Sequence, residues 1–146
     1  MSKILKQKNQ ITVPSSLDYL KDVDDFVEKR LKRVGLPEDL LADVAISVTE
    51  AVTNAIVHGN KNDLEKSVVI TLEITEQEII VWIKDQGNGF DPESVPSPVE
   101  KDNLLKKVGR GIFILKSLMD EVDFTFEPEG GTLVKIVKHF KVVKKS

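Results

Sequence analysis

A carboxylate and an amide lie four residues apart in a long segment without any helix breaker. In "EDLLADVAISVTEAVTNAIVHGN", residues 38–60, Glu50 and Asn54 are one helical turn apart, so a helix places both on one side. An amide oxygen is a neutral hard ligand that suits Mg²⁺, and a carboxylate one turn away can orient or deprotonate a nucleophile near that metal. Ile46 and Val57 lie within about 40° of the pair at about 100° per residue. A solvated helix face is the alternative interpretation of the pair.

His58 continues the same side of this segment. A single histidine on a helix is more often a hydrogen-bonded structural residue than a ligand, and we interpret His58 in that way.

A second group of candidate residues follows an apolar run, in "EIIVWIKDQGNGFDP". Asp85 only accepts hydrogen bonds, so it can accept one from the exocyclic amino group of an adenine. Gly87 and Gly89 would let the chain turn closely around that base, and Phe90 would supply an apolar wall. The alternative is a tight turn in which Asp85 caps its own backbone.

A third segment, "GRGIFIL", begins with two glycines at the expected start of a short helix. The free N–H groups and the dipole at such a start form an anion site, and Lys107 and Arg110 add positive charge. A flexible junction is the alternative interpretation of Gly109 and Gly111. The segment lacks the Gly-Lys-Ser/Thr of a Walker loop, and it does not follow a strand as a Rossmann fingerprint does.

The elements that must position these residues can be expected from periodicity and turn residues. The predicted elements are an edge strand over 4–14, a helix with apolar residues at 20, 23, 27, 31 and 34, a helix from Pro37 to Gly59, a strand hairpin over 67–75 and 78–85, a short helix from Gly109, and a second hairpin over 122–140 that turns at Gly130 and Gly131. The proline-bearing stretch of about residues 91–108 is predicted as a loop or lid. This order predicts a single α+β domain over 1–146, a two-layer sandwich with helices on one face of a mixed, mostly antiparallel sheet.

Composition excludes several kinds of protein. The 146 residues contain no cysteine, so disulfides, thiolate metal sites and cysteine nucleophiles are ruled out. The net charge of −3 argues against direct nucleic-acid binding. The start "MSKILKQKNQ" has no apolar leader, and no stretch is expected to reach the length of a membrane span. These features favour a cytosolic protein without a membrane partner.

The three segments, in this order, resemble the N, G1 and G2 boxes of the gyrase–Hsp90–histidine kinase–MutL (GHKL) ATPase superfamily, which has the Bergerat fold. The matching stretches are "EAVTNAIVHGN", "DQGNGF" and "GRGIFILKSLMDEV". The chain is most similar to the bacterial anti-sigma factor serine/threonine kinases of the RsbW and SpoIIAB type, and the resemblance covers nearly its whole length.

The resemblance implies ATP and Mg²⁺ as cofactors and assigns roles by position. It implies that Asn54 binds the Mg²⁺, that Glu50 is the general base toward an acceptor hydroxyl, and that Asp85 accepts from the adenine amino group. The other nucleotide-binding residues that it implies are Gly87, Gly89, Phe90, Gly109, Arg110, Gly111, Ile112 and Thr132.

Two positions depart from the family pattern. Arg110 stands between the G2 glycines, where many relatives have leucine or methionine, and Lys107 stands where some relatives place an arginine. Lysine supplies charge without the planar fork of arginine, so Lys107 and Arg110 are both candidates for stabilising the transferring phosphate.

The activity expected from the resemblance is that of an ATP-dependent kinase. It would phosphorylate a serine or threonine of an anti-anti-sigma protein of the STAS type, and it would bind a sigma factor and form a homodimer. The alternative is a non-catalytic switch, in which ATP sets the affinity for a partner without phosphoryl transfer. A sensor histidine kinase is not expected, because the chain offers only His58 and His139 and no phosphoacceptor helix.

Overall fold

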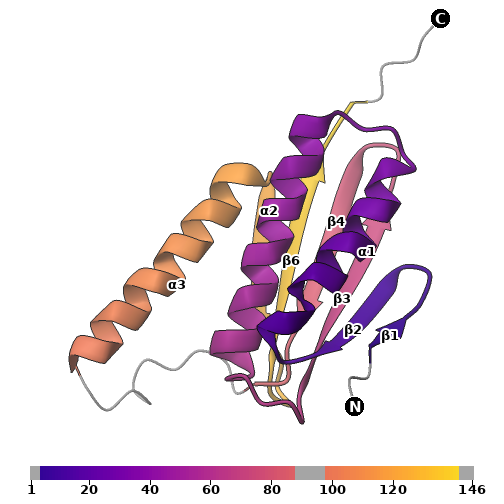
Figure 1. Cartoon of the computed structure of the whole chain (residues 1–146). Helices are drawn as coiled ribbons and strands as arrows, with labels where there is room; N and C mark the ends of the chain where they lie inside the picture. The colour runs from indigo at the N-terminus through magenta and orange to yellow at the C-terminus, as the bar shows by residue number, and fades with distance from the viewer. Residues whose placement is uncertain (1–3, 88–97, 142–146) are drawn as a thin grey trace, which may run out of the picture.

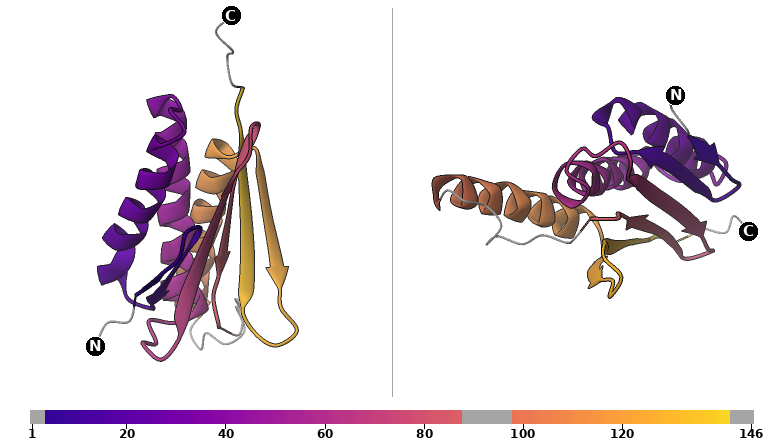
Figure 2. Two further views of the ribbon diagram at one scale, coloured as in Figure 1. Left: turned by 90° about the vertical axis from the view of Figure 1, so that its right-hand side faces the viewer. Right: turned by 90° about the horizontal axis from the view of Figure 1, so that it is seen from below.

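The computed structural model describes residues 4–87 and 98–141. Three α-helices pack on one face of a six-stranded sheet in the order β1-β2-β3-β4-β6-β5 (Figures 1 and 2). The strands are β1 (Leu5–Lys6), β2 (Gln10–Pro14), β3 (Ser67–Ile74), β4 (Glu78–Lys84), β5 (Glu121–Phe126) and β6 (Thr132–His139). The helices are α1 (Leu20–Lys32), α2 (Glu38–Asn54) and α3 (Pro98–Leu118), with a short 3₁₀ turn, η1 (Leu17–Tyr19), before α1.

The predicted two-layer α+β sandwich is confirmed. Every strand pair among the described residues is antiparallel, so the sheet has none of the parallel pairing that a mixed sheet would require. Alternate residues of each long strand face the helices, as the two-residue period of a strand demands. In β4, for example, Ile79, Val81 and Ile83 are fully buried.

The helices cover this apolar face with apolar stripes of their own. From α1 and α2 the core receives Val23, Phe26, Val27, Leu31, Val44, Val48, Ala51 and Val52, and α3 adds Leu115. Burial at about 25 cal/mol per Å² of apolar surface makes this layer the main stabilising contribution of the fold. α1 and α2 lie side by side over the sheet, and α3 flanks α2 and reaches beyond the sheet (Figures 1 and 2).

Local signals fix the turns between these elements. The Ser16 side chain accepts a hydrogen bond from the Asp18 N–H at 3.2 Å, and Gly35 ends the first helical region with φ +72°. Thr75 closes the β3–β4 turn, where its hydroxyl accepts from the Glu78 N–H at 3.0 Å. Gly130 and Gly131 both have φ +101° in the β5–β6 turn, as their place in the sequence predicts.

The predicted second helix is confirmed, and it ends in a π turn, η2 (Ala55–Gly59). The Asn60 N–H donates to the Ala55 carbonyl at 2.8 Å, which widens the last turn. Contrary to our expectation, one segment, Glu38–Gly59, is long and apolar enough to cross a membrane by length and composition. In this fold the same apolar residues pack against the sheet, which accounts for their number.

Two predicted elements differ from the structure. The first strand is divided into β1 and β2, because the polar residues 7–9 form a turn in which the Gln7 N–H donates to the Gln10 carbonyl at 2.7 Å. The loop predicted over 91–108 is wrong from residue 98 onward, since α3 begins at Pro98 and runs without a break through Gly109 and Gly111. Proline is tolerated in a first helical turn, and an Asp102–Lys106 ion pair at 3.0 Å supports the helix.

Candidate functional site

The carboxylate of Asp85 lies at the end of β4, and it is only 4% exposed. The Asp85 N–H donates to the Thr132 carbonyl, and Asp85 Oδ1 accepts from the N–H groups of Thr132 and Gly87, each at 3.0 Å. Asp85 therefore caps the backbone, as the alternative interpretation predicted, and it does so through Oδ1. Among residues 4–87 and 98–141, no donor is found for Oδ2, which lies against Gly59. Asp85 also lines the pocket described below.

Burial raises the pKa of the Asp85 carboxyl above its ordinary value. The hydrogen bonds from Thr132 and Gly87 and the charge of Lys66 act in the opposite direction, in that order of size. The ionised form of this buried acid would gain from a neutral donor that reaches Oδ2.

Glycines let the backbone pack tightly around this carboxylate. A Cβ on Gly87 would collide with the carbonyl of Gly59, and a Cβ on Gly59 would collide with the carboxylate of Asp85. The end of the long helical segment and the end of β4 therefore touch through backbone atoms. We expected Gly87 to let the chain turn closely around a bound base; the close approach that the structure shows at Gly87 is to the Gly59 carbonyl, and the contact with a base stays a prediction.

Asn60, which is not among the predicted site residues, holds Gln86 directly after Asp85. Asn60 is 1% exposed. Its amide donates to Ser15 Oγ at 2.8 Å and to the Ser67 carbonyl at 3.0 Å, while Oδ1 accepts from the Gln86 N–H at 2.7 Å. One side chain thus joins the ends of β2, β3 and β4. Because the buried Asn60 amide makes all three of these hydrogen bonds, it holds Gln86 and the end of β4 in place.

Glu50 and Asn54 lie on the side of α2 that faces α3. A Cβ on Gly111 would lie 2.5 Å from Glu50 Oε1 and 2.9 Å from Asn54 Nδ2. The two side chains therefore meet the backbone of α3, and the predicted one-turn spacing places them together as expected. Both are half-buried, so the solvated-face alternative does not describe this contact.

His58 also lies in this region. Burial, and to a lesser degree the ammonium of Lys107, lower the pKa of the imidazole, whereas Glu50 raises it. The ring is therefore neutral at pH 7. We interpreted it as a hydrogen-bonded structural residue, but the described part of the chain offers its ring no hydrogen bond, and His58 lines a pocket.

A pocket of about 300 Å³ lies between α2, α3 and the β5–β6 side of the sheet. This volume is at the lower end of the range of small-molecule sites. Its lining is Ala51, Asn54, Ala55, His58, Gly59, Asp85, Val108, Ile112, Leu115, Phe124, Phe126, Thr132 and Val134. A mostly apolar wall with one buried carboxylate, one amide and one imidazole suits a planar heterocycle with polar edges.

The predicted site residues are brought together only in part. Asn54, Asp85, Ile112 and Thr132 line the pocket. Glu50 does not line it: its carboxylate meets Asn54 at Gly111, and it borders a separate pocket beside Leu20 and Lys21 of α1. Arg110 and Lys107 are exposed on α3. Gly89 and Phe90 lie outside the described residues.

The prediction that the G2 glycines open a helix is wrong for this structure. Gly109 and Gly111 lie inside α3, where their N–H groups follow a full turn of helix, so they form no anion site at a helix start. A Cβ on Gly109 would meet nothing within 4 Å.

The sequence analysis missed the aromatic wall of the pocket. Phe124 and Phe126 are exposed by 39% and 65%, and they line the pocket from the helix-facing side of the edge strand β5. Their two-residue spacing was the available signal, because it places both on one face of a strand.

The fold is that of a known class of protein. Residues 13–138 match the histidine kinase-like ATPase domain, so the chain belongs to that family. Within this family, the chain is 34% identical over 139 residues to the serine-protein kinase RsbW of Staphylococcus aureus, in strains JH9 and Newman among others. The alignment covers 90% of this chain and 86% of the relative.

A solved structure supports the same fold. The crystal structure of the RsbU and RsbW domains of Rv1364c from Mycobacterium tuberculosis is similar with a TM-score of 0.64 and 16% sequence identity. The match covers 88% of this chain and 32% of that chain, so this chain spans about a third of it. The expected membership of the GHKL superfamily, near the RsbW kinases, is confirmed.

Proposed function

We propose that this protein is an ATP-dependent serine/threonine kinase that acts on a separate protein. The observation that supports the proposal is that Asn54 and Asp85 line one pocket and that Glu50 meets Asn54 at Gly111, in a chain 34% identical to a serine-protein kinase. Asp85 Oδ2 suits the adenine amino group, because it is an acceptor without a donor among the described residues. The walls formed by Ile112, Phe124 and Phe126 suit the faces of the base.

The groups of the chain then have distinct tasks in phosphoryl transfer. The acceptor hydroxyl attacks the γ-phosphorus, the bond to the β–γ bridging oxygen breaks, ADP leaves, and Glu50 takes the hydroxyl proton. Asn54 offers the amide oxygen that would hold Mg²⁺, which supplies charge neutralisation at the phosphates when bound. Lys107 and Arg110 are the candidate cations of α3 for the transferring group, and both are exposed.

The partners proposed are an anti-anti-sigma (STAS) protein as the phosphate acceptor and a sigma factor as the protein that is held. We also propose a homodimer and a cytoplasmic location. The support for these points is the similarity to RsbW, together with a net charge of −3 that disfavours direct nucleic-acid binding. Sedimentation of the purified chain tests the dimer directly.

Transfer of labelled phosphate tests the kinase proposal. Purified protein is incubated with γ-labelled ATP, Mg²⁺ and a candidate STAS protein, and the wild-type chain is expected to label the acceptor. Glu50→Gln is expected to bind ATP normally and to lose about 10²–10⁴-fold in transfer rate, the usual contribution of a general base. Glu73→Gln, an exposed carboxylate on β3, is the matched control.

The alternative function is a non-catalytic switch, and the placement of the G2 glycines inside α3 favours it. In that case ATP would bind and change the affinity for a partner, while no acceptor becomes labelled. Unchanged transfer by Glu50→Gln would instead remove Glu50 from the mechanism.

A further inference from the structure

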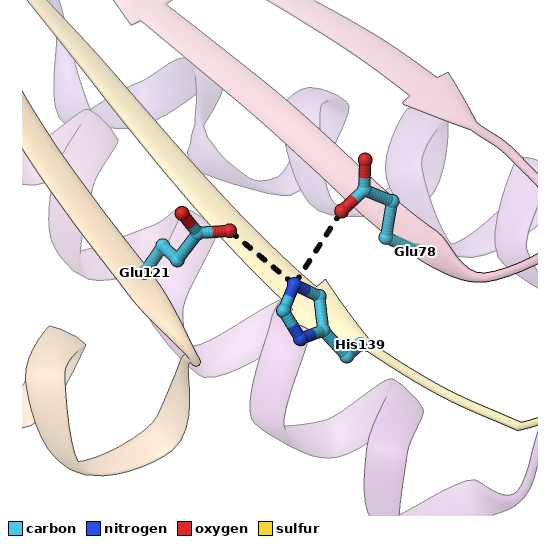
Figure 3. Close-up of side chains that lie close together, drawn as sticks. All are labelled: Glu78, Glu121 and His139. Carbon is cyan, nitrogen blue, oxygen red and sulfur yellow. Dashed lines mark hydrogen bonds and ion pairs between the residues drawn. The ribbon is translucent and has the colours of Figure 1, made fainter.

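Three strands bring a histidine and two glutamates together on the sheet face opposite the helices. Glu78, Glu121 and His139 come from β4, β5 and β6, and each offers one ligand atom within 4.8 Å of the others (Figure 3). The Nε2 atom of His139 lies 3.4 Å from Glu78 Oε2 and 3.3 Å from Glu121 Oε2. Both carboxylates thus point at the same nitrogen.

The contact of His139 Nε2 with Glu121 Oε2 at 3.3 Å is a long hydrogen bond, which leaves the Glu78 carboxylate without one from this ring nitrogen. A charge-assisted N–H···O bond is about 2.7–2.9 Å long, and one ring nitrogen has at most one hydrogen to share between two acceptors. In a tetrahedral site with bonds of about 2.0–2.1 Å, by contrast, neighbouring ligand atoms lie about 3.3–3.4 Å apart. The two nitrogen–oxygen distances match such tetrahedral edges.

The backbone fixes the three positions without any ion. Glu78 and His139 are direct partners in the β4–β6 ladder, and Glu121 pairs with Val137, two residues before His139. The His139 N–H donates to Asp120 Oδ2 at 2.6 Å, and the neighbouring Phe140 N–H donates to the Gln77 carbonyl at 2.9 Å. The ligand positions are therefore set by strand register, which reduces the entropy that an ion would have to overcome.

We propose that Glu78, Glu121 and His139 form a zinc site with its fourth position open to solvent. One imidazole and two carboxylates are typical ligands of Zn²⁺, whereas Mg²⁺ and Ca²⁺ favour oxygen ligands alone. The two carboxylates balance the charge of the ion. Their side chains are 33% and 54% exposed, and that of His139 is 55% exposed, so an ion and its water can reach the site.

The site is separate from the proposed nucleotide pocket. Glu78 begins β4 and Lys84 ends it next to Asp85, and the six steps between them span about 20 Å at about 3.3 Å per residue. A zinc ion here would tie the edge strand β5 to β4 and β6. Because β5 also carries Phe124 and Phe126, an ion bound on the opposite face of the sheet would restrict the movement of this side of the pocket.

Calorimetric titration of the chain with ZnCl₂ tests the site. The protein carries no histidine tag, a chelator removes its metal beforehand, and no nucleotide is present. The wild-type chain is expected to bind one zinc per chain, and to melt at a higher temperature with zinc than without. His139→Ala and Glu121→Gln are expected to lose at least tenfold in affinity. In a parallel titration, Co²⁺ is expected to give the intense visible absorption of four-coordinate cobalt.

Two controls keep the test specific. Glu73→Gln removes a carboxylate from the same face of the sheet, and Asp25→Asn alters the acidic group formed by Asp24, Asp25 and Glu28; neither is expected to change zinc affinity. The proposal is overturned if the wild-type chain binds no zinc, if His139→Ala binds it equally well, or if Asp25→Asn abolishes binding. Because no ATP is used, these outcomes are independent of the kinase assay.

Discussion

The two carboxylate oxygens of Asp85 have different surroundings. Oδ1 accepts two backbone hydrogen bonds and so shapes the loop, whereas Oδ2 is left beside Gly59 on the pocket wall. The structural and the ligand-binding interpretations of this acid are therefore compatible. A substitution that keeps the shape of the side chain and changes only Oδ2 can distinguish the structural role of Asp85 from its role in ligand binding.

Asp85→Asn is such a substitution. The amide oxygen can still accept from Thr132 and Gly87, but the amide nitrogen would present a donor to the adenine amino group, which is also a donor. An unmatched buried donor costs about 1–3 kcal/mol, so we expect ATP affinity to fall roughly 5- to 150-fold. Calorimetric titration with ATP and Mg²⁺ measures this fall, and undiminished affinity would contradict the role of Asp85.

The raised pKa of Asp85 predicts a pH dependence of stability with a defined sign. The folded state binds the proton more tightly than the unfolded state, so stability from this group is present below the ordinary pKa of 3.8 and is lost as the pH rises through the folded pKa. Relative to Asp85→Asn, the wild-type free energy of unfolding should therefore decrease as the pH rises through this window. Urea unfolding of both proteins from pH 4 to pH 7 measures the difference.

Binding of ATP should have the opposite pH dependence. The adenine amino group needs the ionised carboxylate, so affinity should fall as the pH drops through the folded pKa of Asp85. The loss should begin at a higher pH than the ordinary value of 3.8 implies, because burial raises this pKa. A pH-independent affinity over the same range would show that Asp85 does not contact the base.

At the scale of elements, α2 and α3 meet through a glycine. Gly111 lets the backbone of α3 approach Glu50 and Asn54 more closely than any other residue would allow. Gly109, two positions earlier in the same helix, faces open space. Gly109 and Gly111 thus have the same helix propensity, but only Gly111 lies against Glu50 and Asn54.

Gly111→Ala and Gly109→Ala form a matched pair of variants. Each gains roughly 0.8–1 kcal/mol of helix propensity, so Gly109→Ala should stabilise the chain by about that amount. In Gly111→Ala the new methyl group must displace the flexible end of Glu50, so transfer should fall at least tenfold while the chain stays folded. Thermal unfolding together with the labelled-phosphate assay checks both.

At the scale of the whole molecule, the nucleotide should stabilise the fold. The pocket is built from α2, α3, β4, β5 and β6, so a bound nucleotide joins elements far apart in the sequence. Ligand at about 100 times its dissociation constant adds about 2.7 kcal/mol to the free energy of unfolding. ATP with Mg²⁺ should therefore raise the melting temperature, and a chelator should remove most of that gain; no shift with ATP would argue against a nucleotide site.

The layers of the fold and a few residues of the pocket could be predicted from the sequence alone. Apolar periods of about 3.6 and 2 residues place the helices and strands, because burial of one face requires them. Glu50 and Asn54 share a side through simple helix geometry, and Asp85 ends a buried strand, so three of the site residues could be named before any coordinates.

Two features depend on long-range packing: the helical conformation of residues 98–111, and the grouping of residues that no local pattern connects. The prolines and glycines of this stretch predicted a loop, but packing of Gly111 on α2 and an uninterrupted run after Pro98 allow a helix. Likewise, Glu78, Glu121 and His139 meet because of strand order and register. Register depends on long-range pairing, which local sequence periods do not specify.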